Sequence, residues 1–281
     1  MLRIVIDASA DMPPEWIEKY DLSILPMPIQ IGGRTYYQGL DITNAQFYKL
    51  VQDKNMVPKS AAPSPLKISQ IFESIYRAGD SILALTVSSK MSATYDMVVD
   101  AAKQLKKKFK VHVFDSGGGS VLLGFMGKEA RLLGRAGKTL KEIQTRLEEI
   151  RERTALVFTV DQLEFARRSG RVSTLQAALG SLLNIKPIIV LREGLLSVAG
   201  NVRTRKKSLN RIIEMLKNQV QDRKVNVAVV HADDPGTAEL LKERISRILN
   251  CAEVVVTDLS LAVAANLGPG TVGIVACPVD A

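Results

Sequence analysis

The chain has 281 residues, of which 46% are hydrophobic and 24% are charged, and its formal net charge is +9. These proportions are typical of a globular protein and exclude disordered and fibrous classes, and at roughly 150 residues per domain the length indicates two domains. Two cysteines, two histidines and 5% aromatic residues exclude a disulfide scaffold, a multi-histidine metal site and a binding face of stacked rings. The low cysteine content favours a reducing, cytoplasmic location.

The first half of the chain alternates apolar, β-branched runs with segments of helical periodicity. The predicted strands are 3–6, 81–87 and 111–114. The predicted helices are 43–53, 65–77, 92–107, 119–135 and 139–153, with Thr43 and Ser64 as N-caps of the first two. Residues 22–39 are rich in proline and glycine and are expected to form a small irregular or β-ribbon excursion. Because no basic region precedes an apolar stretch at the start, we expect no signal peptide.

The second half repeats this alternation. Its predicted strands are 155–160, 187–191, 225–231, 254–257 and 273–276, and its predicted helices are 161–168, 175–183, 205–221 and 235–249. Strand–helix alternation with nearly continuous apolar strands predicts an α/β fold with mainly parallel sheets. The charged helix ending near 153 marks the boundary between domains 1–153 and 154–281. The uncharged stretch 259–279 contains three glycines and two prolines, so we expect no membrane-spanning helix there.

Two polar segments follow predicted elements at positions where α/β proteins bind ligands. Residues 88–94 carry four hydroxyl side chains, and Ser92 with the backbone N–H groups near Ala93 would form an anion cradle at a helix N-terminus. Alternatively, Ser92 only caps that helix. Ser60 lies in a stiff, proline-rich turn and could face a ligand, or the turn could be inert with Ser64 as a helix cap.

Four other residues are weaker candidates for chemistry. Asp7 and Asp115 end strands and could hold a cation or take a phosphoryl group, but we expect them to accept hydrogen bonds from local backbone. His231 could act as a base, yet no nucleophile motif accompanies it. Asn266 would be the polar tip of a glycine-rich run before the last strand, or part of a plain turn.

Most of the excess positive charge lies in one segment. Residues 163–211 contain ten Lys/Arg against two Glu, so this segment carries 10 − 2 = +8 of the net charge. Arg171, Arg203 and Arg205 belong to it. The clustering indicates an anionic partner or substrate, with a solvated basic face as the alternative.

Seven short segments, in order, resemble motifs of the DegV family of bacterial fatty-acid-binding proteins. They are Asp7-Ala8-Ser9-Ala10-Asp11-Met12-Pro13, Ser60-Ala61-Ala62-Pro63-Ser64-Pro65, Ser88-Ser89-Lys90-Met91-Ser92-Ala93-Thr94-Tyr95, Arg168-Ser169-Gly170-Arg171-Val172, Leu183-Asn184-Ile185-Lys186-Pro187-Ile188, Val202-Arg203-Thr204-Arg205-Lys206-Lys207 and Gly268-Pro269-Gly270. The resemblance covers essentially the whole chain. The sequence departs from the family pattern with Ser60 for Thr, Ala93 for Gly and, most notably, Asn266 for His.

The resemblance implies two α/β domains with one acyl chain in a tunnel between or within them. It further implies that the carboxylate meets the hydroxyls of Ser60 and Ser92, the backbone N–H of Ala93 and the side chain of Asn266. Such a protein is not itself a catalyst but presents the acid to a separate fatty acid kinase, which makes the acyl phosphate for phospholipid synthesis. We hypothesise that the segment with Arg171, Arg203 and Arg205 lies near the tunnel opening and docks the kinase or faces the incoming phosphate.

A carrier of this kind would draw its affinity from the tail. Burying about fourteen methylenes at ~0.8 kcal/mol each stabilises the complex by on the order of 11 kcal/mol before association costs, against ~1.5–3 kcal/mol for a charge-assisted hydrogen bond. The ligand is then a long-chain fatty acid, with no cofactor, no metal and at most transient contact with a membrane surface. Two alternatives are an enzyme acting on a small anionic metabolite in the inter-domain cleft and a nucleic-acid-binding or regulatory protein, the latter disfavoured by the low aromatic content.

Overall fold

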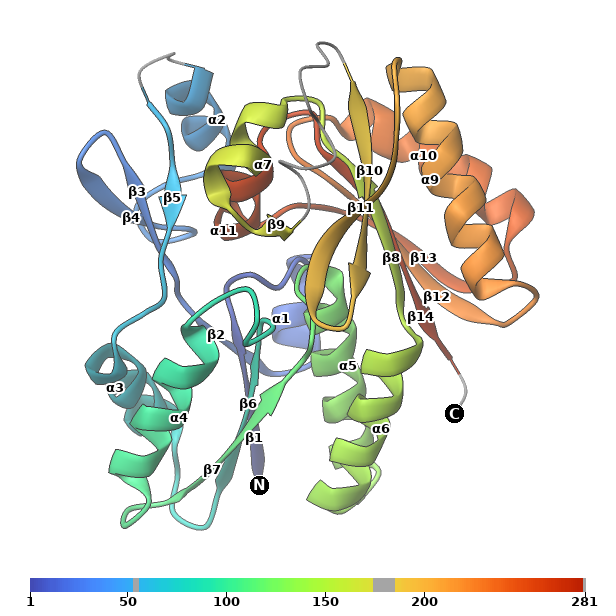
Figure 1. Ribbon diagram of the computed structural model, residues 1–281. Coiled ribbons are helices and arrows are strands. Elements are labelled where there is room, and N and C mark those ends of the chain that lie inside the picture. Colours follow the sequence, from blue (N-terminus) through green and yellow to red (C-terminus); the bar gives the residue numbers. More distant parts are fainter. Residues whose placement is uncertain (53–55, 174–184, 280–281) are drawn as a thin grey trace.

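The computed structural model describes residues 1–52, 56–173 and 185–279. Its first sheet has four parallel strands in the order β2-β1-β6-β7. They are β1 (Leu2–Asp7), β2 (Leu22–Leu25), β6 (Ser81–Thr86) and β7 (Lys110–Asp115). Because all four run the same way, their carboxyl ends and the loops that follow them share one edge of the sheet. In Figure 1 this edge points toward the part of the molecule that holds the second large sheet, described below.

Helices cover both faces of this first sheet because alternate strand residues point to opposite sides. Ile4 and Ile6 face α5 (Val121–Arg135), while Val5 packs with Phe72 of α3 (Pro65–Ile75) and with α4 (Thr94–Leu105). Ser64 caps α3 as predicted: its hydroxyl accepts from the Lys67 backbone N–H at 3.3 Å. The short helix α1 (Glu15–Lys19) adds Trp16, whose ring packs on α5.

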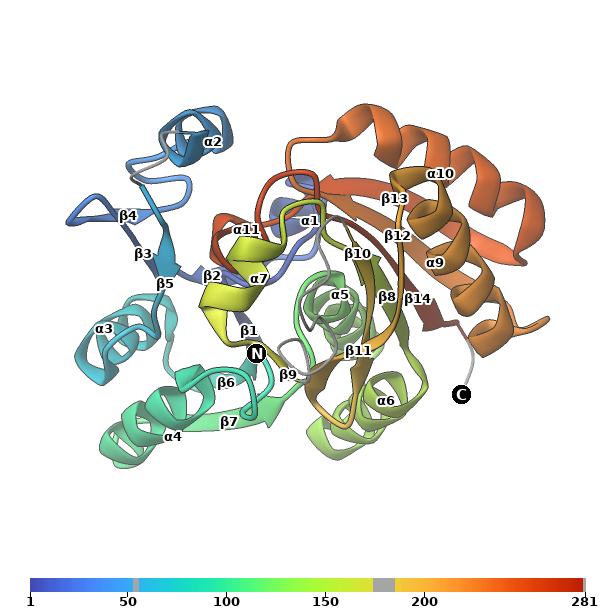
Figure 2. The same cartoon turned by 45° about the horizontal axis from the view of Figure 1, so that its top comes forward.

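The second sheet has seven strands in the order β13-β12-β14-β8-β10-β11-β9. They are β8 (Ala155–Thr159), β9 (Val172–Ser173), β10 (Lys186–Arg192), β11 (Leu195–Val202), β12 (Val225–His231), β13 (Cys251–Asp258) and β14 (Val272–Pro278). Helices α9 (Arg205–Val220) and α10 (Pro235–Ile248) cover its outer face (Figures 1 and 2).

The predicted α/β fold is confirmed, with one difference in strand direction. The first sheet is parallel, but the second is mixed: β12–β13 and β9–β11 are parallel pairs, and the other four neighbouring pairs are antiparallel. A strand buried on both faces needs a continuous apolar run whichever way it points, so the sequence pattern did not distinguish the two directions.

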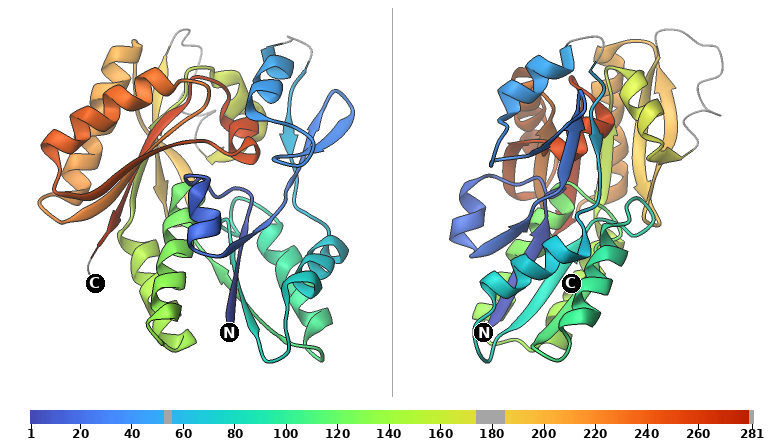
Figure 3. Two further views of the ribbon diagram at one scale, coloured as in Figure 1. Left: turned by 180° about the vertical axis from the view of Figure 1, so that it is seen from behind. Right: turned by 90° about the vertical axis from the view of Figure 1, so that its left-hand side faces the viewer.

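The expected excursion is a small third sheet of three antiparallel strands, whose order is β4-β3-β5. They are β3 (Pro28–Ile31), β4 (Arg34–Tyr37) and β5 (Lys59–Ser60), with α2 (Asn44–Gln52) inserted between β4 and β5. Within the predicted excursion 22–39, residues of β2 belong instead to the first sheet. Figure 3 shows this small sheet standing beside α11 (Leu261–Leu267), and α11 packs against β5.

Helices α5 and α6 (Leu140–Arg153) connect the two large sheets. α5 lies between the two large sheets (Figure 2) and contacts both β1 and β14. One apolar core therefore runs from the first sheet to the inner face of the second. The first sheet draws its strands from residues 2–115 and the second from 155–278, and the boundary at 153/154 stays a prediction. The helix predicted over 175–183 lies outside the described residues. Over the part of the chain that is described, no helix combines the length and apolar character needed to cross a bilayer.

Candidate functional site

An apolar cavity lies between the inner face of the second sheet and the loops at the carboxyl edge of the first. The space within it, with open solvent at its mouth included, is about 1080 Å³. Its walls come from β5, β8, β12, β14, the β10–β11 hairpin, α11 and the loops that follow β1, β6 and β7. The larger apolar side chains that line it are Met27, Val87, Met91, Leu156, Phe158, Leu191, Leu196, Val230, Leu259, Val263, Leu267, Ile274 and Val275.

Burial differs between the two ends of the cavity. Phe158, Val230 and Val275, on the inner face of the second sheet, are buried. The exposed lining residues are Ala61, Ala93 and Arg171, so the mouth lies where these three meet solvent. Ala61 and Ala93 directly follow Ser60 and Ser92. The residues predicted to hold a carboxylate therefore stand at the open end, and the deep end is apolar.

The structure brings Ser60, Ser92, Ala93 and Asn266 to the wall of one cavity. Ser60 comes from β5, and the side-chain amide of Asn266 on α11 donates to its hydroxyl at 2.9 Å and to the Ala262 carbonyl at 2.7 Å. Ser60 and Asn266 are 206 positions apart in the chain and meet because α11 packs against β5.

Ser92 lies in the loop between β6 and α4. Its hydroxyl shares a 2.9 Å contact with the Thr94 hydroxyl and accepts the Thr94 backbone N–H at 3.2 Å. α4 begins at Thr94, two residues later than expected, with Ala93 as the residue before its first turn. The first N–H groups of a helix lack partners within it, and for the Ala93 N–H no acceptor lies among the described residues. These groups can therefore donate to an anion at the mouth.

Two further serines line the cavity, and their hydroxyl protons are already engaged. Ser9 Oγ donates to the carboxylate of Asp7, and Ser120 Oγ donates to the carboxylate of Asp11. Asp7 also accepts backbone N–H groups of Ser9 at 2.9 Å and Val87 at 2.6 Å. These buried carboxylates hold the loops after β1 in place behind the cavity wall.

Burial makes both carboxylates hard to ionise. It raises the pKa of Asp7 above its ordinary value, against the opposing hydrogen bonds from Ser9 and Val87. It raises the pKa of Asp11 to about 7, although Ser120 and the Ser260 backbone N–H, at 2.6 Å, both donate to it. Asp11 thereby ties the loop after β1 to the start of α11, the helix that carries Asn266.

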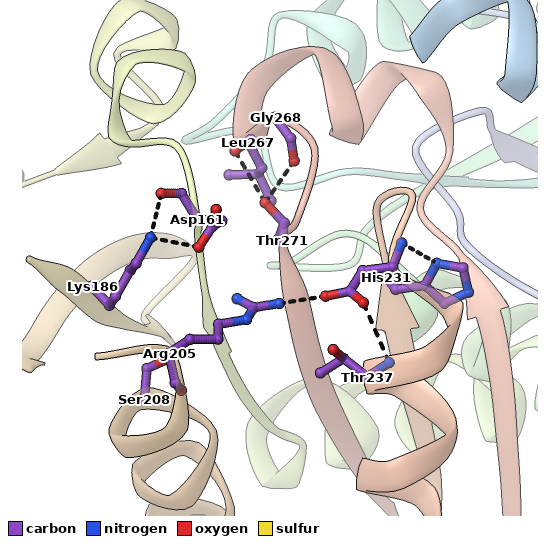
Figure 4. A network of polar contacts seen from close by, with 10 residues as sticks. Asp161, Lys186, Arg205, Ser208, His231, Thr237, Leu267, Gly268 and Thr271 are labelled. Carbon is purple, nitrogen blue, oxygen red and sulfur yellow. Dashed lines mark hydrogen bonds and ion pairs between the residues drawn. The ribbon is translucent and has the colours of Figure 1, made fainter. Parts of the chain in front are cut away.

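The three predicted basic residues do not lie together. Arg171 lines the cavity mouth beside β9, which pairs with the start of β11 through Val172 and Leu196. Arg203 and Arg205 follow the other end of β11, and this eight-residue strand spans roughly 25 Å. Arg203 is exposed, whereas Arg205 donates to the Asp234 carboxylate at 2.8 Å (Figure 4).

The weaker candidates take structural roles. Asp7 and Asp115 accept hydrogen bonds from local backbone, as expected: the donors are the N–H groups of Ser9 and Gly117. Each also accepts an N–H group from the residues that follow β6, Val87 for Asp7 and Ser89 for Asp115. His231 Nδ1 lies 3.4 Å from the Asp234 backbone N and belongs to the network with Arg205 and Thr237 in Figure 4. It does not line the cavity. The described residues contain no cluster of three or more His, Cys, Asp or Glu side chains arranged to hold a metal ion.

Sequence reasoning did not identify several cavity residues. Ser9 and Ser120 follow strands of the first sheet, so the rule that selected Ser92 would also have found them. Leu191 and Leu196 flank the turn of the β10–β11 hairpin, and nothing in their local sequence separates a cavity wall from an ordinary core strand. Met27 precedes β3 and reaches the cavity only through the fold of the third sheet.

The fold and the site define an α/β protein that encloses a deep apolar cavity with hydrogen-bond donors at its mouth. The family described as "Uncharacterised protein, DegV family" matches residues 1–279. The chain belongs to the DegV family. A DegV domain-containing protein of Streptomyces coelicolor is 30% identical over 276 residues, which cover 98% of this chain and 97% of that protein.

Two solved structures in this family share the whole fold. A DegV-family protein from Thermus thermophilus, described as binding fatty acid, superposes with a TM-score of 0.91 at 27% identity, over 99% of both chains. The DegV protein of Bacillus subtilis, described as a fatty acid binding protein, superposes with a TM-score of 0.86 at 26% identity, again over 99% of both chains.

Proposed function

We propose that this chain is a carrier that binds one long-chain fatty acid and has no catalytic step of its own. The observation that carries this proposal is the polarity of the cavity: its deep end is apolar and buried, and its uncommitted donors stand at the mouth. Membership of the DegV family supports it, because relatives with the same fold are described as fatty-acid-binding proteins.

The deep end suits the tail. Side chains such as Phe158, Val230 and Val275 offer no hydrogen bonds, so a polar ligand buried there would lose its hydration without compensation. An acyl chain makes no hydrogen bonds with water that burial would break, and each buried methylene stabilises the complex by ~0.8 kcal/mol. The tail therefore supplies most of the affinity.

The polar groups set the direction in which the acid binds. Ser9 and Ser120 also line the cavity, but their protons are held by Asp7 and Asp11. Ser60 and the Ala93 N–H remain as donors, with Asn266 beside them, and Ser92 can donate when the Thr94 hydroxyl gives its proton to Ser92 Oγ. Arg171 is the one cation among the described lining residues. None of these lining residues is acidic, so no wall residue repels a carboxylate at the mouth. Deeper in, burial among apolar side chains would disfavour the charged form of the acid.

Titration of the lipid-free protein with acids of different length tests this function. We expect hexadecanoic acid to bind with one molecule per chain and butanoic acid to bind at least a thousandfold more weakly, since it buries only about two methylenes. Equal affinity for the two acids would reject the carrier and favour the alternative, an enzyme that acts on a small anionic metabolite.

The finer part of the proposal is that the carboxylate at the mouth is presented to a fatty acid kinase, which converts it to an acyl phosphate for phospholipid synthesis. Arg171 is exposed at the mouth and would face the acidic kinase surface or the incoming phosphate. The basic residues Arg203 and Arg205 would add a second contact at the far end of β11. With loaded carrier, kinase and ATP, Arg171→Glu should slow acyl phosphate formation at least tenfold. Arg247→Glu, an exposed change on α10, should leave the rate unaltered.

A further inference from the structure

Both amide protons of Asn266 form hydrogen bonds within the protein. Its nitrogen donates to the Ala262 carbonyl at 2.7 Å and to the Ser60 hydroxyl at 2.9 Å. A side-chain amide nitrogen carries two protons, so these two bonds use its full donor capacity. The Ala262 carbonyl can only accept, and this fixes the nitrogen, and not the oxygen, on the side of Ser60.

The bond from Asn266 determines what the Ser60 hydroxyl can do. Ser60 Oγ accepts a proton from Asn266, and among the described residues its own O–H has no acceptor. A hydroxyl that accepts one hydrogen bond becomes a better donor in the next, because successive bonds polarise one another. Ser60 lies at the cavity mouth, half-buried, so its proton is available to a ligand there.

We infer that Asn266 is a positioning residue that directs the Ser60 proton toward the bound head group and makes this site selective for a hydrogen-bond acceptor. It gives no proton of its own to the ligand. The site then favours an ionised carboxylate over an alcohol with the same tail, because an alcohol accepts a weaker, uncharged hydrogen bond. This inference rests on the proposed function and names the residue pair that decides its head-group selectivity.

The variant Asn266→Asp reverses the direction of the key hydrogen bond. Aspartate replaces the amide nitrogen with an oxygen, which can only accept, so the Ser60 proton turns toward residue 266 and away from the ligand. The affinity for hexadecanoic acid should fall at least 30-fold, while the affinity for hexadecanol should change less than threefold. Asn250→Asp is the matched control, since Asn250 is exposed and does not line the cavity, and it should alter neither affinity.

A double-mutant cycle keeps the inference testable if Asn266→Asp does not fold. Ser60→Ala should weaken hexadecanoic acid binding by about 10- to 100-fold. Because Asn266 acts through Ser60, the double variant Ser60→Ala with Asn266→Ala should bind the acid as Ser60→Ala alone does. Ser60→Thr retains the hydroxyl and should restore both affinity and the preference for acid over alcohol.

The outcomes separate this inference from the carrier function. If the unaltered protein binds the acid and the losses from Ser60→Ala and Asn266→Ala multiply, Asn266 acts on the ligand directly and the inference is wrong, while the carrier stands. If Asn266→Asp lowers the affinities for the acid and for the alcohol by the same factor, the selectivity claim is wrong, while the carrier stands. If the unaltered protein binds neither ligand, the carrier function and the inference fail together.

Discussion

The hydroxyl of Ser88 donates a 2.7 Å hydrogen bond to the backbone carbonyl of Gly194. Ser88 follows β6 in the first sheet, and Gly194 lies in the turn of the β10–β11 hairpin in the second. Beside it, Lys90 Nζ donates to the Glu193 carbonyl, also at 2.7 Å. The same loop continues to Ser92 at the cavity mouth, so this contact joins the hairpin wall of the cavity to the loop that carries Ser92 and Ala93.

A side chain at Gly194 would crowd the Ser88 hydroxyl. The φ of Gly194 is +82°, and an added Cβ would lie 2.9 Å from Ser88 Oγ. We expect Gly194→Ala to destabilise the fold by more than the ~1–2 kcal/mol of a left-handed alanine, and to weaken fatty acid binding. Gly79→Ala is the matched control, since Gly79 has a φ of +85° and nothing within 4 Å of the added Cβ. Chemical denaturation and acid titration of both variants check this, and equal losses would contradict it.

Removing the Ser92 hydroxyl should weaken the binding of the fatty acid and leave the fold intact. Ser92→Ala loses one charge-assisted hydrogen bond to the carboxylate, so hexadecanoic acid should bind roughly tenfold or more weakly in calorimetric titration. Ser89→Ala serves as the control, because Ser89 is exposed and donates to Asp115 without lining the cavity. Unchanged affinity in Ser92→Ala would remove this residue from the head-group site.

Filling the deep end should shorten the acid that the cavity accepts. Val230 is buried in the cavity wall, and Val230→Phe places a ring where the tail would run. A series of saturated acids should show the affinity of the unaltered protein rising by about 15-fold for each two carbons, from ~0.8 kcal/mol per methylene. In Val230→Phe the rise should stop at a shorter chain. Leu240→Phe, exposed on α10, should follow the unaltered protein; an identical series for Val230→Phe would show that the tail lies elsewhere.

The buried carboxyl of Asp11 should make stability depend on pH. Its pKa is raised from 3.8 to about 7 in the folded protein, so between these values the folded state binds more protons than the unfolded state. Stability supplied by this group is therefore greatest below about pH 4 and is lost as the pH rises to about 7. Asp11→Asn removes the titration. The free energy of unfolding of the variant should rise relative to the unaltered protein between pH 4.5 and pH 8.

Urea denaturation at the two pH values measures this difference. Comparing the two proteins at each pH isolates Asp11 from Asp7, whose pKa burial also raises. An amide at position 11 can still accept the Ser260 N–H and can donate to Ser120 Oγ, so the local hydrogen bonds persist. A stability difference between the two proteins that does not change with pH would be inconsistent with a raised pKa at Asp11.

The sequence predicts local structure well, because the signals are local. Apolar runs mark the strands, and Ser64 followed by Pro65 marks the start of α3. Strand direction in the second sheet was not predictable in this way, since an apolar strand such as β8 reads the same in either direction. Direction is decided by the connections, among them the Glu193–Gly194 turn between β10 and β11.

The structure places the four predicted head-group residues on one cavity wall, but the contacts between them could not be predicted from the sequence. Ser60 and Ser92 lie in segments that resemble family motifs, and Asn266 lies two residues before the Gly268-Pro269-Gly270 motif. The bond from Asn266 to Ser60 depends instead on the packing of α11 against β5. The separation of Arg171 from Arg205 depends in turn on the length of β11. Closeness in sequence therefore does not predict closeness in space when an extended strand lies between two residues.

The most direct test of the carrier is native mass spectrometry of the purified protein, followed by organic extraction and identification of the lipid. The account predicts one long-chain fatty acid per chain, released when the protein is unfolded, and partly lost in Ser92→Ala. A protein that is purified empty, and whose melting temperature does not rise when hexadecanoic acid is added, would contradict it.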